Sequence, residues 1–251
     1  MYTKTIVVLA KSYKQGGWCI AGREINLDLK ANTFDVSGGW VRPVSDDNAH
    51  HGALLDMHCA FADGSTPRIY DIVEVELQCP APEIGQPENH SLTGKAWNRI
   101  NDITPDAIHA FSEDVPDIWL EDQSNNYVTD VYAQFGNVSS SLVIIRPSDF
   151  QIHLSNNLNE YTGEFKKETR GAFTYKGVRY TDISITDPAI RKMLRNQYPA
   201  QGYPEIVTTL NAGDNCYLCC SLAPAWGGNN RHYKLIATVF DFDGYIQRTY
   251  G

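Results

Sequence analysis

The apolar residues of this 251-residue chain come in short runs. Residues 6–10 and 142–145 are purely apolar stretches with the length of a β-strand. Both are far shorter than the roughly 20 residues that a membrane-spanning helix needs. The chain is therefore predicted to fold from short strands and to have no membrane partner.

Glycine-rich turns separate these runs. The tripeptide Gly-Gly-Trp occurs twice, ending at Trp18 and Trp40, and each copy opens a strand-like segment. Further along, Val73, Val75 and Leu77 alternate with glutamates, which is typical of an antiparallel strand with one face in water. Glycine turns followed by alternating apolar and charged residues indicate antiparallel β-structure.

Short strands with few helices favour small β-barrels over a parallel α/β sheet. The clearest helix is predicted over residues 186–197, where Thr186 or Asp187 is the cap and Pro188 the first residue. We expect a mainly β protein of two small barrels with a few short helices. The first barrel is predicted over residues 1–145, with an acidic helical or loop insertion near 100–135, and the second over 146–251.

Charge is distributed unevenly along the chain. The net charge is −9, but residues 1–150 hold 10 Lys and Arg against 21 Asp and Glu, whereas residues 151–251 hold 11 against 9. No lysine or arginine occurs between Arg99 and Arg146. The acidic stretch at 102–122 is interpreted as a solvated face, as a docking segment for a partner protein, or as a mask over a basic groove.

Signatures of catalysis are missing from the sequence. It has no nucleophile elbow, phosphate-binding loop or zinc-protease motif, so we expect a protein that is not an enzyme. A polar loop is a candidate for ligand binding; its residues are Gln86, Glu88, Asn89 and His90. This loop is also the basis of an alternative function, that of a nucleotide-processing hydrolase.

The six cysteines do not form a metal-binding pattern. Cys216 and Cys220 fall on one apolar strand face with Leu218, so buried thiols are expected there, with no metal and no cofactor. The residues after Met1 lack the apolar core of a secretory signal, and the predicted location is cytoplasmic.

Basic and aromatic residues occur together in several segments. Single-strand binders need this mixture, because cations follow the phosphates and flat rings stack on the bases. For each aromatic residue the alternative is an ordinary place in the core. The candidates for nucleic-acid or nucleotide binding are Lys11, Lys14, Trp18, Arg23, Trp40, Arg42, Lys166, Lys167, Arg170, Tyr175, Arg179, Trp226 and Arg231.

Three segments resemble the sequences of a known family: AGRE at residues 21–24, GWVRPVS at 39–45 and QPENH at 86–90. With these segments and a looser match at 216–220, the sequence resembles the bacterial dual OB-containing domain family over nearly its whole length. The resemblance implies two OB-like barrels, which bind oligonucleotides or oligosaccharides. It also implies a nucleic-acid or nucleotide sensor without a catalytic centre, associated with bacterial conflict and phage defence.

The predicted function is non-catalytic binding or sensing of single-stranded nucleic acid or a nucleotide. The first alternative is an adaptor scaffold that docks a protein through residues 102–122, and the second is the hydrolase.

Overall fold

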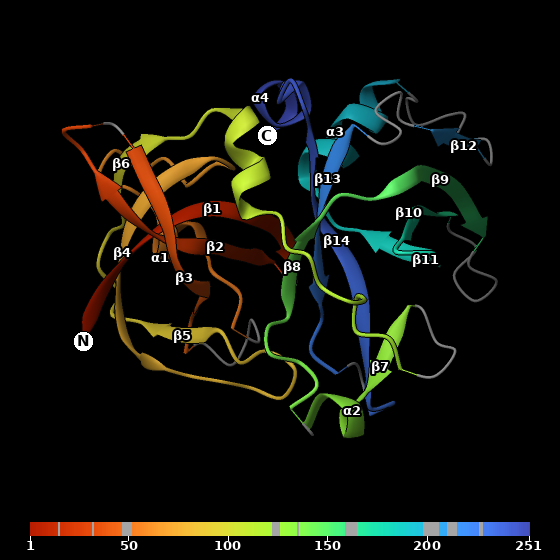
Figure 1. The fold of residues 1–251 in the computed structure, drawn as a ribbon, viewed down its shortest axis with the longest axis horizontal. Coiled ribbons are helices and arrows are strands. Elements are labelled where there is room, and N and C mark those ends of the chain that lie inside the picture. Colours follow the sequence, from red (N-terminus) through yellow and green to blue (C-terminus); the bar gives the residue numbers. More distant parts are fainter. Residues whose placement is uncertain are drawn as a thin grey trace.

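The computed structural model describes residues 1–251 except for 15, 32, 47–51, 122–125, 135, 159–164, 198–205, 210–214 and 226–227. Side chains are described for the same residues except 14, 156–158, 165–167 and 206–209. Figure 1 shows the first part of the chain, red to yellow, on one side and the strands of the second part, green to blue, on the other.

Strands make up most of the regular structure. The first group of elements is β1 (Tyr2–Lys14), β2 (Gly17–Asp28), β3 (Thr33–Val44), α1 (Asp56–Cys59), β4 (Asp71–Pro80), β5 (Asn89–Leu92) and β6 (Asn98–Asp102). Between the two groups lie η2 (Pro105–Phe111), β7 (Tyr127–Thr129), α2 (Asp130–Gln134) and β8 (Leu142–Ile145). The last group is β9 (Ser148–Leu158), β10 (Phe165–Tyr175), β11 (Val178–Ile185), α3 (Pro188–Gln197), β12 (Ile206–Thr209), β13 (Cys216–Leu222), β14 (Arg231–Asp241) and α4 (Tyr245–Tyr250).

The first sheet is a closed barrel of five strands. Its order is β1-β2-β3-β5-β4, and β1 also pairs with β4, which joins the two ends of the sheet. All neighbours are antiparallel except β3 and β5, which are parallel. We call this unit the first barrel; β6 pairs in addition with residues 71–74 at the start of β4.

The second sheet repeats the pairing pattern of the first. The order β9-β10-β11-β14-β13 matches β1-β2-β3-β5-β4. The parallel pair β11 and β14 corresponds to the parallel pair β3 and β5 of the first barrel. β12 pairs with β9 as β4 pairs with β1, and β13 pairs with β14 as β4 pairs with β5. The role of the fourth strand is thus divided between β12 and β13. The prediction of a mainly β fold built on barrels is confirmed.

Glycine permits a close approach at the same place in both sheets. A Cβ on Gly22 of β2 would overlap the carbonyl oxygen of Val7, and a Cβ on Gly171 of β10 would overlap the side chain of Ile236. Each glycine lies next to an irregularity in strand pairing. Glycine at such a point allows the strand to bend, which a small barrel requires.

Two strands from the connecting segment belong to the second sheet. β7 pairs with β14, and β8 pairs with β13, from Ile145 opposite Leu218 to Leu142 opposite Ser221. The chain therefore passes from the first sheet to the second between β6 and β7, whereas we expected the second barrel to begin at residue 146. The local pattern could not show this, because the partner of β8 lies more than 70 residues further along the chain.

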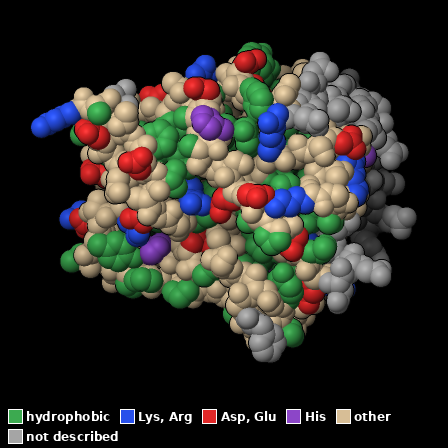
Figure 2. Space-filling model, viewed as in Figure 1, with side chains coloured by type: hydrophobic (Ala, Val, Ile, Leu, Met, Phe, Trp, Pro, Cys, Tyr) green, Lys and Arg blue, Asp and Glu red, His purple; other side chains and the backbone are tan. Residues whose placement is uncertain are grey.

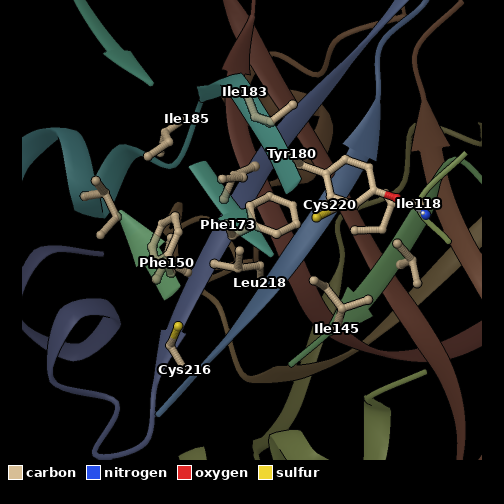
Figure 3. Close-up of a cluster of buried hydrophobic side chains, with 14 of the residues drawn as sticks. Ile118, Ile145, Phe150, Phe173, Tyr180, Ile183, Ile185, Cys216, Leu218 and Cys220 are labelled. Atoms are coloured by element: carbon tan, nitrogen blue, oxygen red, sulfur yellow. Dashed lines mark hydrogen bonds between the residues drawn. The ribbon is translucent and has the colours of Figure 1, made fainter. Parts of the chain in front are cut away.

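Three groups of apolar side chains fill the molecule. One fills the second sheet, where Cys216, Leu218 and Cys220 point into the same cluster as Phe173 and Tyr180 (Figure 3). The predicted buried face of this strand is confirmed. A second group fills the first barrel around Ile6 and Val73.

The third group, which we call the shared core, joins the two sheets. Leu9 and Trp40 of the first barrel pack in it with Ile144, Cys219 and Phe240 of the second sheet. The two halves of the chain are therefore packed against each other through apolar side chains.

The acidic stretch is packed rather than merely solvated. Ile118 and Trp119 are buried, and the backbone N–H of Ile118 donates to the hydroxyl oxygen of Tyr180 at 2.9 Å (Figure 3). The side chain of Glu121 accepts hydrogen bonds from the backbone and hydroxyl of Thr129. This part of the chain is attached to the second sheet.

Candidate functional site

A cavity of about 130 Å³ lies between the first barrel and the second sheet. Strands β1 to β3 form one wall with Ser12, Tyr13 and Ala21, and the other wall carries Ala223 and Leu235. Most of the lining is apolar. Such a cavity can hold a flat ring out of water, as engineered cavities of similar volume hold benzene.

Arg42, which lines the cavity, forms a buried ion pair with Glu88. Nη2 of Arg42 lies 3.2 Å from Oε1 of Glu88 and donates to the hydroxyls of Ser141 at 2.8 Å and Ser221 at 3.4 Å. Glu88 also accepts hydrogen bonds from the backbone N–H and the hydroxyl of Ser141. Arg42 is only 8% exposed, so its guanidinium joins the two sheets and does not face solvent as a phosphate contact.

The predicted polar loop also holds the halves together. Nε2 of Gln86 donates to the carbonyl of Leu222 at 3.1 Å, and Asn89 donates to Gln86 at 3.3 Å. His90 lies 2.5 Å from the hydroxyl of Tyr2 through Nδ1. Burial, helped by Lys4, lowers the pKa of His90 below its ordinary value. The loop residues thus have structural partners within the chain.

An aromatic and cationic group lies at one side of the cavity. Nζ of Lys11 is 4.4 Å from the ring centroid of Trp18, and the ring of Tyr13 stands edge-on to Trp18 at 5.1 Å. Tyr13 is 53% exposed and also lines the cavity. Nε1 of Trp18 donates to Asp56 at 2.6 Å, and Lys11 donates to the carbonyl of Pro67 at 2.8 Å. Burial lowers the pKa of Lys11. We call Lys11, Tyr13 and Trp18 the hairpin cluster.

A second aromatic and cationic group lies beyond the opposite wall. The guanidinium of Arg231 is 4.3 Å from the ring centroid of Tyr127, and Tyr233 packs against Tyr127 at 6.0 Å. The backbone of Tyr233 accepts a hydrogen bond from the N–H of Ala223, which lines the cavity. Of the two groups, Tyr13 lines the cavity itself, and the second group is connected to the lining only through the backbone of Ala223.

Two predicted stacking residues are buried. Trp40 is 5% exposed and donates from Nε1 to Glu113 at 3.0 Å, and Tyr175 is 8% exposed and donates to the carbonyl of Val115 at 3.0 Å. Both side chains are therefore largely covered by other parts of the molecule. Both residues hold core positions, which was the alternative to stacking. Glu113 and Val115, in the segment that connects the two sheets, contact them.

Three further predicted cations form ion pairs within the chain. Arg23 lies 3.1 Å from Glu113, and Arg179 lies 2.8 Å from Asp149. Arg170 lies 3.4 Å from Glu168 and 3.6 Å from Asp182. On the face shown in Figure 2, Lys and Arg side chains are scattered among Asp and Glu and do not form one patch. The side chains of Lys14, Lys166 and Lys167, and all of Trp226, lie outside the described residues.

Several site residues could not be identified from the sequence. Ser141 and Ser221 complete the Arg42 network, and Tyr127 and Tyr233 form the second aromatic group. Serine in a connector and tyrosine in a strand are too common to be informative alone. Tyr13 could have been found, because it lies between two lysines directly before the Gly-Gly-Trp turn.

Neither a metal centre nor a membrane span is found in the described ranges. These ranges contain no group of three His, Cys, Asp or Glu side chains that could hold a metal ion. None of their helices has the length and apolar character that a bilayer crossing requires.

Comparison with known proteins gives one match. The family model described as "Dual OB-containing domain" matches residues 4–239. No curated protein and no solved structure matches the chain.

Proposed function

Because the chain belongs to the dual OB-containing domain family, for which a binding role is indicated, we propose that it binds single-stranded nucleic acid or a nucleotide. The cavity between the two halves, which is lined by the exposed ring of Tyr13 next to Trp18 and Lys11, is the observation that carries this proposal. OB barrels bind single strands by stacking bases on aromatic side chains beside cations.

The hairpin cluster is the proposed place for a base. Tyr13 offers an exposed ring, and Lys11 is already held over the adjacent ring of Trp18. A base that enters between Tyr13 and the opposite wall would leave water for a mainly apolar surface. Stacking of this kind contributes about 1–3 kcal/mol per base.

Ion pairing within the chain favours a short ligand. Arg23, Arg42 and Arg179 all contact carboxylates of the chain, and the net charge is −9. A long strand needs many phosphate contacts, whereas a nucleotide or a few bases needs few. The proposal therefore centres on bases recognised by stacking, and it keeps the cytoplasmic location and the link to bacterial conflict and phage defence as predictions.

Fluorescence polarisation with labelled single-stranded DNA, single-stranded RNA, duplex and mononucleotides tests the proposal. We expect Tyr13→Ala and Trp18→Ala to weaken binding to single strands or nucleotides by about tenfold each. Tyr245→Ala is the matched control, because Tyr245 is also an exposed tyrosine that stands edge-on to a second ring, here Tyr250. Equal effects of Tyr13→Ala and Tyr245→Ala, or no binding to any probe, would contradict the proposal, and the adaptor function would then be tested first.

A further inference from the structure

A second cavity, of about 410 Å³, lies beside the first barrel and is distinct from the one between the sheets. Arg23 and Trp40 line it from β2 and β3, and Ser139 and Ser140 line it from the segment before β8. His90 and two carboxylates, those of Glu88 and Glu113, complete the polar lining. The cavity is therefore rich in groups that form hydrogen bonds.

The carboxylate of Glu113 holds the basic and N–H donor groups of this cavity. Its Oε2 lies 3.1 Å from Nη1 of Arg23, and its Oε1 accepts a hydrogen bond from Nε1 of Trp40 at 3.0 Å. One anionic group thus bridges a guanidinium and an indole N–H. These are the contacts that a bound phosphate or carboxylate would make.

Arg23 has a further donor that the described part of the chain leaves without a partner. Its Nε is buried and makes no hydrogen bond there. A buried donor without an acceptor is unfavourable, whereas an anion with more than two oxygens can satisfy Nε and Nη together. The site is incomplete with Glu113 as its occupant.

Only the side chain of Glu113 has to move for the site to open. Its backbone N–H donates to the carbonyl of Ile144 at 2.7 Å, which fixes the segment, whereas its side chain is 28% exposed. The other carboxylate, Glu88, is engaged by Arg42 and Ser141 and is 4% exposed at its side chain. Glu113 is the group that an incoming anion can replace.

We propose that Arg23 and Trp40 form an anion site that Glu113 occupies in the chain without ligand, and that a phosphate group displaces this carboxylate. The inference rests on the proposed function for the source of the phosphate, a nucleotide or a strand end. A phosphate carries about −1.5 to −2 charges near pH 7 and three acceptor oxygens, against one charge and two oxygens for Glu113. It therefore satisfies Nη1 and Nε of Arg23 and the indole N–H at the same time.

Isothermal calorimetry with inorganic tripolyphosphate tests the site without a base. We expect Glu113→Gln to tighten binding by about tenfold, because the competing charge is removed while an oxygen remains for Trp40. Asp114→Asn is the matched control: it removes the same charge one residue further on, where Asp114 pairs with Lys176 at 2.5 Å and is 91% exposed. Its effect should be less than twofold.

The dependence on Arg23 completes the test. In the Glu113→Gln background, Arg23→Gln should abolish the gained affinity, and Glu113→Asp, which shortens the competing side chain, should give a smaller gain of the same kind. Equal gains from Glu113→Gln and Asp114→Asn, or a gain that survives Arg23→Gln, would overturn the proposal.

Comparing tripolyphosphate with nucleotides and single strands tests the anion site separately from the proposed function. A nucleotide that gains affinity with Glu113→Gln as much as tripolyphosphate does supports phosphate as the displacing group. If tripolyphosphate shows no gain while single strands still depend on Trp18, the anion site fails and the proposed function stands.

Discussion

Gly85 of the first barrel packs directly against the imidazole of His232 in the second sheet. A Cβ built on Gly85 would lie 3.0 Å from Nδ1 of His232. The ring cannot move away, because Nδ1 is 2.9 Å from the carbonyl of Ala223 and Nε2 is 2.7 Å from Asp130. The connection between β4 and β5 is therefore fitted to β14 with no room for a side chain.

Replacing Gly85 by alanine tests this fit. Gly85 has φ +72°, so alanine costs about 1–2 kcal/mol in backbone strain even without a neighbour. Gly94→Ala is the control, because Gly94 has φ +82° and nothing within 4 Å of its Cβ position. Urea denaturation should show a larger loss of unfolding free energy for Gly85→Ala than for Gly94→Ala, and equal losses would contradict the tight contact.

The ion pair of Arg42 and Glu88 gives a second prediction. Arg42→Met leaves the Glu88 carboxylate buried without its cation, and breaking such a pair costs about 3–5 kcal/mol. Lys95→Met is the comparison, because Lys95 pairs with Glu76 at 2.6 Å but its side chain is 69% exposed, where a pair contributes about 1 kcal/mol or less. Adding Glu88→Gln to Arg42→Met should restore part of the stability. No recovery in the double variant would indicate that packing, and not the uncompensated charge, determines the loss.

Lys234 predicts a dependence of stability on pH. Burial lowers its pKa to about 8, whereas a lysine in the unfolded chain has a pKa of about 10.4. Between these values the unfolded chain binds more protons, so this residue adds stability as the pH rises. The stability of the wild type relative to Lys234→Met should therefore increase by up to about 3 kcal/mol from pH 8 to about 10.4. Denaturation curves of both proteins across this range would show a constant difference if the lysine were not perturbed.

The thiols should differ sharply in reactivity. Cys79 is exposed, whereas burial raises the pKa of Cys59 to about 11 and that of Cys220 to about 12. Only the thiolate reacts with iodoacetamide. Mass spectrometry of the folded protein at pH 8 should show fast modification at Cys79, slower reaction at Cys19 and little at the buried thiols until urea is added. Loss of the fast phase in Cys79→Ser is the control, and rapid reaction at Cys220 in the folded protein would show that the second sheet opens easily.

The sequence predicted best what is encoded by neighbouring residues. Asp187 caps α3, accepting from the backbone N–H groups of Ala189 and Ile190. The alternation that buries Cys216 and Cys220 is also a local signal. In each case the determining contacts lie within a few residues.

The features that were not predictable depend on distant contacts. Glu113 reaches Arg23 across 90 positions of sequence, and Trp40 becomes buried because that distant segment covers it. A barrel strand with tryptophan and arginine is the same sequence whether its outer face meets a ligand or another part of the chain. The buried place of Trp40 and the pairing of Arg23 are therefore properties of the assembled molecule.

The pairing of β8 with β13 has a consequence for synthesis on the ribosome. All strands of the first barrel are complete once residue 92 has emerged, so this barrel can close early. The four residues of β8 are all buried in the finished protein, yet their partner strand is translated later, from residue 216 onward. The nascent chain thus carries β8 as an apolar strand without its partner until β13 is made, and we expect aggregation to be most frequent in this interval.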